Sequence, residues 1–325
     1  MKFQRRKFLH LAAGAAVLPA VSRVARAQAY PARPINIVIP FGAGTGTDTL
    51  TRIIAQPLGI ALKQTIVIEN KPGANGAIGA TQVARALPDG YTLLMSTNSP
   101  HSAAPTLNRT IAYDPIRDFT PITRAGSYTF AFAIHSTIPV NSISELIAFA
   151  KANPGKLSYA SGNTSGIVAG ETFKRKAGID LLHVPYKAVP PAINDVLGGR
   201  VSMVIADLTP SLPHIRAGTL RPLAVTRIRR SALLPEVPSL HEAGITDFDM
   251  DSWAGLFAPA GTPTDIVTRL NAELRKIIDT SDFKSRLADI GFEAFSSSPE
   301  ELGEFAKTQL VKWTQMIKDA AIEPE

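Results

Sequence analysis

The sequence contains no cysteine. This absence excludes disulfide bonds, thiolate metal sites, cysteine nucleophiles and a lipid anchor on an N-terminal cysteine. Long apolar runs are also missing, since no segment after residue 27 reaches the roughly 18 consecutive apolar residues that a membrane-spanning helix needs. Internal repeats and low-complexity tracts are absent as well. We therefore expect a globular chain without a stable membrane anchor.

Recognisable catalytic motifs are also missing. The histidines show neither i,i+4 pairing nor His-Glu-x-x-His spacing, so we expect no metal site. There is no Walker A sequence and no Gly-x-Ser-x-Gly elbow, because residues 162–166 place the serine one position late. These absences favour a protein without catalytic residues and without a cofactor. A hydrolase that assembles serine, histidine and aspartate from distant positions stays open as an alternative.

The first 27 residues have the three parts of an export signal. Arg5 and Arg6 precede an apolar run at 8–21, and Ala25-Arg26-Ala27 offers a small-residue cleavage site. The paired arginines favour the twin-arginine route. A short membrane anchor is the other interpretation, but about 14 apolar residues are too few to cross a hydrocarbon core of ~30 Å. We expect residues 1–27 to be removed and the remaining chain to be periplasmic.

The basic character of the chain belongs to this N-terminal segment. The full chain has a net charge of +7 at pH 7, from 34 lysines and arginines and 27 acids. Residues 1–27 hold six of the basic residues and no acid, so 28 basic and 27 acidic residues remain, a net charge of about +1. The high isoelectric point therefore gives no reason to expect nucleic acid as a partner.

The rest of the chain alternates short β-branched runs with helical patterns, which is typical of an α/β protein. About 298 residues suit two domains better than one. The pattern predicts two lobes built on largely parallel sheets, with ligands at the carboxyl ends of the strands. We expect strands at 35–39, 65–68, 91–95, 130–134, 157–160, 201–206 and 222–226, and helices at 49–62, 77–87, 142–152 and 167–177.

The C-terminal part is helical in its pattern. Thr262-Pro263 is expected to start one helix, and Ser298 with Glu301 forms a capping box that opens the last one. Trp313 repeats in register with the apolar residues of that last helix, so we interpret it as part of the core.

A glycine-rich loop between the first strand and the first helix is the best candidate for a ligand site. Glycines let a backbone approach a ligand closely, and the free N–H groups at a helix start attract an anion. We therefore expect ligand contacts from Phe41, Gly42, Gly44, Thr45, Gly46, Thr47 and Asp48. For Asp48, a simple helix N-cap is the competing interpretation.

The same loop also imitates a dinucleotide fingerprint. Gly42, Gly44 and Gly46 follow a strand, and Glu69 closes the next strand. The third glycine of the fingerprint is missing, because Thr47 stands at that position. An exported NAD(P)-dependent oxidoreductase that uses this loop is therefore kept as the main alternative function.

Two further loops have the same chemical character. Residues 161–166 lead into a helix and offer Ser161, Asn163, Thr164 and Ser165, and the strand at 91–95 ends in Ser96, Thr97 and Asn98. Small hydroxyl and amide groups at helix starts suit a carboxylate, so we expect a cleft that closes on an anion from both sides. Ordinary strand-to-helix loops use the same residues, which is the competing interpretation of each loop.

Several short motifs, in their order and spacing, resemble one family over nearly the whole chain after residue 27. This family comprises the periplasmic substrate-binding proteins of tripartite tricarboxylate transporters, also called Bug-type receptors. The motifs are Ile39-Pro40-Phe41 with the following glycine loop, Glu69-Asn70-Lys71-Pro72-Gly73, Pro88-Asp89-Gly90-Tyr91, His183-Val184-Pro185-Tyr186-Lys187, Leu223-Ala224-Val225-Thr226, Pro235-Glu236-Val237-Pro238-Ser239, Trp253-Ala254-Gly255-Leu256-Phe257 and Lys312-Trp313.

The resemblance implies a two-lobe periplasmic-binding-protein (Venus flytrap) fold and no enzymatic activity. It implies a receptor that captures a small organic anion, commonly a carboxylate, and delivers it to the permease subunits of a tripartite transporter. Lobe 1 is expected to be formed by residues 30–124 and 252–325, and lobe 2 by residues 125–251. The expected ligand-binding set is completed by Tyr186 and Asp207.

Overall fold

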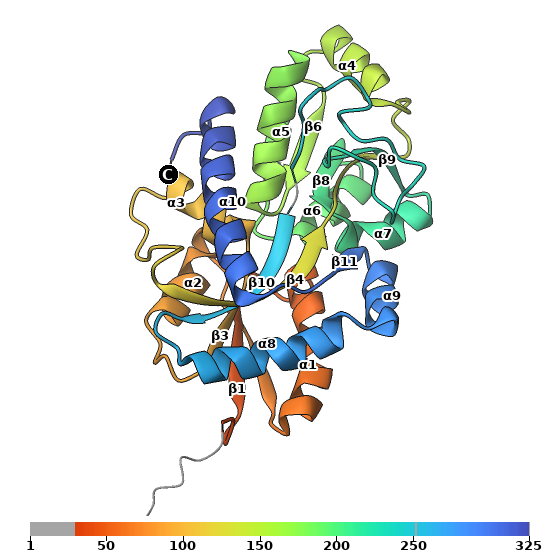
Figure 1. Cartoon of the computed structure of the whole chain (residues 1–325). Coiled ribbons are helices and arrows are strands. Elements are labelled where there is room, and N and C mark those ends of the chain that lie inside the picture. Colours follow the sequence, from red (N-terminus) through yellow and green to blue (C-terminus); the bar gives the residue numbers. More distant parts are fainter. Residues whose placement is uncertain (1–29, 251, 325) are drawn as a thin grey trace, which may run out of the picture.

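The computed structural model describes residues 30–250 and 252–324. The expected export signal at residues 1–27 lies outside the described residues. Two lobes, each a β-sheet flanked by helices, lie one above the other, and the chain passes between them more than once (Figure 1).

The lower lobe in Figure 1 contains a six-stranded sheet with the order β11-β4-β10-β3-β1-β2. Its strands are β1 (Ile35–Ile39), β2 (Ile66–Asn70), β3 (Thr92–Thr97), β4 (Phe119–Tyr128), β10 (Ser252–Pro259) and β11 (Phe292–Ala294). β1 pairs in parallel with β2 and β3. β10 pairs antiparallel with β3 and β4, and β11 pairs antiparallel with β4.

The upper lobe contains a five-stranded sheet with the order β7-β6-β8-β5-β9. Its strands are β5 (Phe130–His135), β6 (Ser158–Ser161), β7 (Leu182–Pro185), β8 (Met203–Asp207) and β9 (Leu220–Val225). β6 pairs in parallel with β7 and β8, whereas β5 pairs antiparallel with β8 and β9.

Both sheets are therefore mixed, with a parallel half and an antiparallel half, rather than largely parallel. The antiparallel pairs involve the strands next to the segments where the chain passes from one lobe to the other. β4 leads from the first sheet to β5 of the second, and β10 brings the chain back antiparallel to β3. β4 also continues to Tyr128, past residue 124, where the lobe boundary was expected.

Helices follow most of the predicted positions. They are α1 (Gly46–Leu62), α2 (Ala77–Ala84), α3 (Ala104–Leu107), α4 (Ile143–Ala152), α5 (Thr164–Ala177), α6 (Val189–Leu197), α7 (Leu208–Arg216), α8 (Thr264–Ile278), α9 (Ser281–Asp289) and α10 (Pro299–Asp319). A 3-10 turn, η1 (Ala74–Gly76), and a π-helical turn, η2 (Ser99–Ala103), complete the set.

Capping side chains explain where these helices begin. α1 and α5 start three residues before their expected positions, because Thr45 and Asn163 accept hydrogen bonds from the first turn. The capping box of Ser298 and Glu301 is confirmed at the start of α10. α8 begins at Thr264, slightly later than expected.

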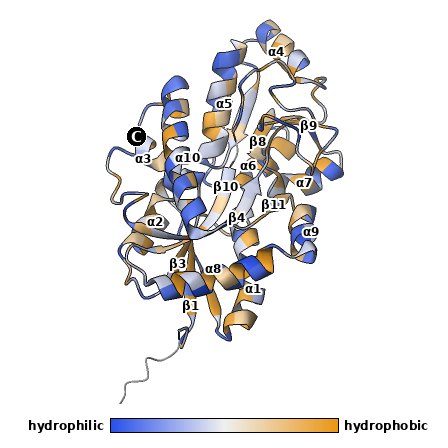
Figure 2. Cartoon of the chain, in the orientation of Figure 1, coloured by the Kyte–Doolittle hydropathy of each residue, from blue (hydrophilic) through white to orange (hydrophobic). Residues whose placement is uncertain are grey.

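The interior of each lobe is apolar. Figure 2 shows orange, hydrophobic segments in both lobes. The last helix, α10, contacts β4 of the first sheet and α5 of the upper lobe. Trp313 on α10 is only 1% exposed and packs in the same cluster as Phe132 and Phe173 of the upper lobe, which confirms it as a core residue. α10 therefore packs against both lobes.

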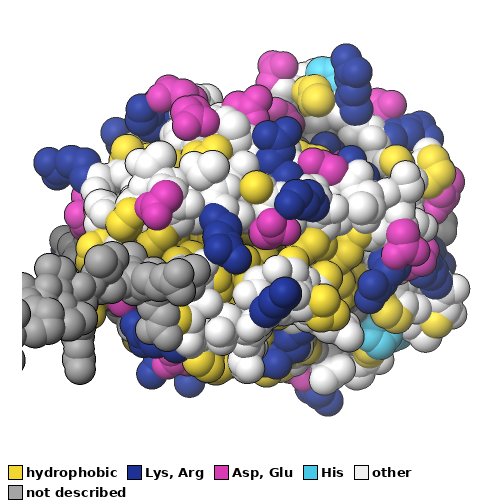
Figure 3. Space-filling view, turned by 60° about the horizontal axis from the view of Figure 1, so that its bottom comes forward, with side chains coloured by type: hydrophobic (Ala, Val, Ile, Leu, Met, Phe, Trp, Pro, Cys, Tyr) yellow, Lys and Arg dark blue, Asp and Glu magenta, His cyan; other side chains and the backbone are white. Residues whose placement is uncertain are grey.

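The surface carries both signs of charge. On the face drawn in Figure 3, acidic and basic side chains are interspersed and do not form a patch of one sign. Among the helices of residues 30–250 and 252–324, none has the length and apolar character that crossing a membrane would require.

Candidate functional site in the cleft between the lobes

A narrow cleft lies where the carboxyl ends of β1, β3, β6 and β8 meet between the lobes. Residues of both lobes line it: Phe41, Thr45, Gly46, Thr47, Thr97, Ser99, Tyr128, Phe130, Gly162, Asn163, Ser165, Val189, Asp207 and Ser252. The space within it that is open to water is about 30 Å³, enough for one or two water molecules. This space is too small for a ligand of several carbon atoms.

The start of α1 forms the lower wall of the cleft. The Thr45 hydroxyl caps this helix by accepting from the N–H of Asp48 and donating to the carbonyl of Gly42, 2.8 Å away. Thr45, Gly46 and Thr47 line the cleft. The N–H groups of Gly46 and Thr47 belong to the first turn and have no acceptor within the helix, so they are available to an anion.

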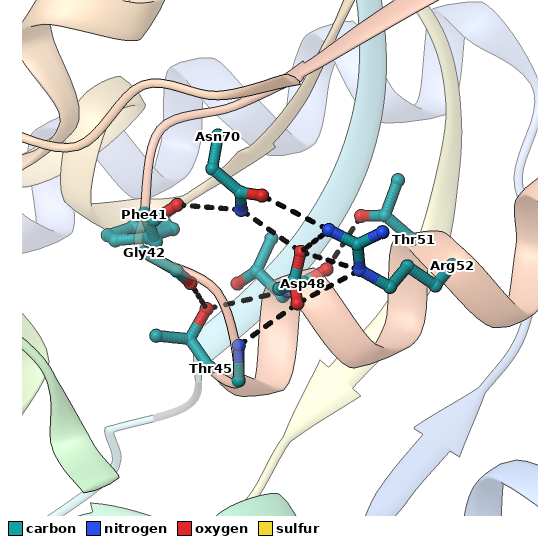
Figure 4. A network of polar contacts seen from close by, with 9 residues as sticks. Phe41, Gly42, Thr45, Asp48, Thr51, Arg52 and Asn70 are labelled. Atoms are coloured by element: carbon teal, nitrogen blue, oxygen red, sulfur yellow. Dashed lines mark hydrogen bonds and ion pairs between the residues drawn. The ribbon is translucent and has the colours of Figure 1, made fainter. Parts of the chain in front are cut away.

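Asp48 supports this loop from behind (Figure 4). Its carboxylate accepts hydrogen bonds from the N–H of Gly44 at 3.0 Å, from Arg52 at 3.0 Å and from the amide of Asn70 at 3.0 Å. Asn70 also donates to the carbonyl of Phe41. Burial raises the pKa of Asp48, but these hydrogen bonds outweigh it and hold the pKa below its ordinary value.

The expected roles of Asp48 and of two neighbouring glycines change accordingly. Asp48 is neither the N-cap of α1, which is Thr45, nor part of the cleft lining. Gly42 and Gly44 do not line the cleft either, although Gly44 has a φ of 78° that favours glycine. The polar network around Asp48 fixes the conformation of the loop, and the start of α1 is the part that faces the cleft.

The start of α5 forms the opposite wall. The Asn163 side chain caps the helix by accepting from the N–H of Gly166 at 3.0 Å. Asn163 and Ser165 line the cleft, whereas Ser161 and Thr164 do not. Ser161 instead hydrogen bonds to His183, and the buried Thr164 hydroxyl has no partner among the described residues.

The polar end of β3 joins the two walls. Of the three residues expected there, only Thr97 lines the cleft. The buried Asn98 amide donates to Ser165 Oγ at 2.7 Å and its carbonyl accepts from Ser252, so Asn98 links the two lobes. Ser96 lies within β3 and hydrogen bonds to His101.

Of the two remaining expected residues, one lines the cleft. Tyr186 lies outside it and donates its hydroxyl to Asp195 near the end of α6. Asp207, at the end of β8, lines the cleft and is only 6% exposed. Burial raises the pKa of Asp207 to about 7, while its own N–H and that of Thr209 act in the opposite direction.

The expected set missed several lining residues. They are Ser99, Tyr128, Phe130, Gly162, Val189 and Ser252. The Tyr128 hydroxyl donates weakly to Thr47 at 3.4 Å. Ser99 and Gly162 belong to loops that were expected to face the cleft and could have been included from the sequence, whereas the other four required the fold.

The described residues do not form a serine–histidine–acid triad around either of their two serine–histidine pairs. Two serine–histidine pairs occur, Ser96 with His101 at 2.6 Å and Ser161 with His183 at 2.7 Å. Neither histidine has a hydrogen bond to an acidic side chain in the described part of the chain, and burial lowers the pKa of His101 to about 3. No group of three or more potential metal ligands is present in residues 30–250 and 252–324.

The dinucleotide interpretation finds no support in the arrangement around β2. Glu69, the acid at the end of the next strand in the fingerprint-like pattern, accepts from Asn36 at 2.7 Å and from Gln82 at 3.1 Å and pairs with Lys71. It is absent from the cleft lining. The carboxylate is therefore already occupied by neighbours on β1 and α2.

Several proteins are similar to this chain over most of its length. BugT of Bordetella pertussis is 32% identical over 297 residues, which cover 90% of this chain and 91% of BugT. The solved structure of R. palustris Rpa4515 with adipate has a TM-score of 0.88 and 34% identity, covering 91% of this chain and all of that chain. MatC from Rhodopseudomonas palustris with bound malate has a TM-score of 0.83 and 30% identity, covering 89% and 100%.

The fold and the cleft define a two-lobe solute-binding protein of the periplasmic-binding-protein type. Such proteins are receptors, not enzymes. The profile of the tripartite tricarboxylate transporter family receptors matches residues 50–322, so the chain belongs to this family of receptors.

Proposed function

We propose that the chain captures a small carboxylate in the interlobe cleft and delivers it to the membrane permease of a tripartite transporter. The convergence of three helix starts on one cleft carries this proposal. α1 and α5 contribute lining residues from their first turns, and Asp207, the N-cap of α7, lines the cleft at the start of a third helix. Their free N–H groups and positive ends favour an anion. The adipate and malate bound by two structural relatives are anions of this kind.

The expected lobes complete this proposal. Residues 30–124 with 252–325 would form one body and residues 125–251 the other, with closure around the ligand by a hinge motion. Donors already aimed at the ligand lose little freedom on binding, which suits capture at low concentration. Export directed by residues 1–27 would place the receptor in the periplasm, where a carboxylate meets the permease.

The ligand class is tested by thermal denaturation in the presence of mono-, di- and aromatic carboxylates, sugars and nucleotides, followed by calorimetry of each hit. A ligand that binds only the folded state adds about 2.7 kcal/mol of stability at 100 times its dissociation constant. We expect hits among the carboxylates alone. Stabilisation by NAD(P) with no effect of any carboxylate would overturn the proposal.

A variant at the start of α1 tests whether this cleft is the site. A Cβ on Gly46 would lie 2.6 Å from Asp207 Oδ1 of the opposite lobe, so Gly46→Ala should obstruct closure. We expect its affinity for the identified carboxylate to fall at least tenfold, about 1.4 kcal/mol. Gly303→Ala on α10 is the matched control, because its methyl would meet only Pro121 at 3.5 Å. Equal affinity of the two variants would place the ligand elsewhere.

A further inference from the structure

Asp207 is the only charged side chain among the described residues that line the cleft. No lysine or arginine is found among these described lining residues. An incoming anion therefore meets helix starts and neutral hydroxyl and amide groups instead. The nearest arginine of the first loop, Arg52, is paired with Asp48 behind that loop. A cleft suited to anions thus contains a fixed carboxyl group.

The carboxyl group of Asp207 is buried and incompletely hydrogen bonded. Its Oδ1 has no hydrogen-bond partner within the described part of the chain, although the N–H groups of Asp207 and Thr209 lie close enough to the carboxyl group to lower its pKa. The Tyr128 hydroxyl, which also faces the cleft, is directed to Thr47. Buried polar atoms without a partner are rare in folded proteins, and an active role in binding is one reason for them.

Asp207 lies next to the helix start that should receive the ligand. A Cβ on Gly46, the first residue of α1, would lie 2.6 Å from Asp207 Oδ1. A ligand carboxylate held by the N–H groups of Gly46 and Thr47 would therefore come close to the Asp207 carboxyl group. Burial raises the pKa of Asp207 to about 7, so the group is ionised above that pH. There, two carboxylates repel each other strongly at such short range when they are shielded from water.

A hydrogen-bond donor on the ligand removes this conflict. A hydroxyl or ammonium group next to the ligand carboxylate can donate to Oδ1 of Asp207, whereas a methylene group at the same position leaves Oδ1 unpaired and the two charges opposed. Sites that hydrogen bond one polar group of a ligand discriminate well against analogues that lack the group.

We propose that Asp207 selects ligands that carry a hydroxyl or ammonium group beside a carboxylate, over plain carboxylates of the same length. This inference rests on the proposed function, because it concerns the same cleft and the same anion. It narrows the ligand class from organic carboxylates to hydroxy acids or amino acids.

Matched ligands that differ in one group test the selection. Succinate, malate and aspartate have the same carbon chain with a hydrogen, a hydroxyl and an ammonium group at the second carbon, and adipate with 2-aminoadipate extends the comparison to six carbons. Binding of each is measured by calorimetry above about pH 7, where Asp207 is ionised. The proteins compared are the parent, Asp207→Asn and Asp282→Asn, whose substitution lies on the exposed start of α9. Melting curves without ligand verify that each variant is folded.

The parent protein should bind a donor-bearing acid at least tenfold more tightly than the plain acid of its length. The relative affinities for malate and aspartate show whether a hydroxyl or an ammonium group is the preferred donor. Asp207→Asn should bring the ratio of the two affinities to about one. It should do so chiefly by tightening the binding of the plain acid, because the amide is neutral and can itself donate a hydrogen bond. Asp282→Asn should keep the parental ratio.

Two outcomes are distinguishable. Selection by Asp207 is overturned if plain acids bind the parent as tightly as their donor-bearing analogues, or if Asp207→Asn leaves the affinity ratio unchanged. In either case the protein would still be a carboxylate receptor. If no carboxylate of either length or of the wider screen binds the parent protein, the proposed function itself fails, and the selection with it.

Discussion

The two loops that face each other across the cleft are stabilised in different ways. In the first loop, which leads into α1, the Asp48 carboxylate gathers hydrogen bonds from Gly44, Arg52 and Asn70 (Figure 4). A Cβ at Gly42 or Gly44 would meet no atom within 4 Å. Before Gly46, whose Cβ would meet Asp207 of the opposite lobe, this loop is thus open in its packing and is fixed by a charged network.

The second loop, which leads into α5, is fixed by close packing. A Cβ at Gly162 would lie 2.3 Å from the backbone of Ala188 and Val189, and one at Gly166 would lie 2.6 Å from the carbonyl of Ile205. Neutral side chains complete it: the Asn163 side chain accepts from the N–H of Gly166, and the Asn98 amide donates to Ser165 Oγ. Glycine serves here to let backbones approach each other.

This difference shows that two loops of similar sequence can respond differently to the same kind of substitution. Glycine, serine, threonine and asparagine dominate both loops, and both present a helix start to the cleft. Loss of a charge should loosen the first loop, whereas added volume should disrupt the second. Each prediction below tests one side of this comparison.

The largest effect is expected from added volume in the second loop. Gly162→Ala places a methyl group against the backbone of α6, where no flexible side chain can move aside. We expect the free energy of unfolding to fall by about 3 kcal/mol, at the upper end of overpacking effects. Gly42→Ala in the first loop should change it by less than about 0.5 kcal/mol.

Denaturant unfolding of both variants measures this contrast. An equal loss of stability in the two variants would show that the loops do not differ in packing, and the comparison would fail.

The second prediction concerns the charge that the upper lobe presents to the first loop. Burial raises the pKa of Asp207 from 3.8 to about 7, so between these values the folded protein holds a proton that the unfolded chain has lost. The stability from this group is therefore complete below about pH 4 and lost as pH rises through about 7. Tyr128, the other ionisable side chain lining the cleft, does not titrate there, because burial raises its pKa.

Asp207→Asn should remove this pH dependence. Relative to the variant, the parent protein should lose about 2 kcal/mol of unfolding free energy between pH 5 and pH 7. Chemical denaturation at several pH values measures the difference, with Asp282→Asn as control. Parallel pH profiles of parent and Asp207→Asn would indicate that the start of α1 keeps Asp207 ionised, and the electrostatic role of the first loop would then be larger than described.

The sequence predicted those parts of the fold and site that depend on neighbouring residues. β1 lies at the expected residues because a short β-branched run is followed by Pro40, and the capping box at Ser298 depends on residues three positions apart. The first loop was expected at the cleft because glycines before a helix favour an anion, and Thr45, Gly46 and Thr47 do line it.

The remaining features depend on contacts between distant segments. Asp48 supports the loop instead of facing the ligand because Asn70, on another strand, reaches its carboxylate. Tyr128 and Ser252 enter the cleft lining only because β4 and β10 connect the two sheets. The antiparallel halves of the sheets have the same origin. No local pattern in the sequence indicates such pairings.

The smallest effect is expected from the charged network of the first loop. Asp48→Asn keeps the shape of the side chain but removes the charge that Arg52 and the N–H of Gly44 share. Arg52 is half exposed, so solvent screens part of the ion pair, and the unfolding free energy should fall by only about 1 kcal/mol. Because the network holds the helix start in place, carboxylate affinity should fall about three- to tenfold.

The pH dependence separates this network from a simple effect of an acid at a helix start. The hydrogen bonds hold the pKa of Asp48 below its ordinary value, so its contribution is present above about pH 4 and lost as pH falls further. Asp265→Asn provides the matched control, because Asp265 is an exposed acid in the first turn of α8. Its substitution removes a similar favourable interaction with the helix dipole but disrupts no hydrogen-bond network. If Asp265→Asn lowers carboxylate affinity as much as Asp48→Asn does, the charged network does not position the first loop, and packing would have to account for both sides of the cleft.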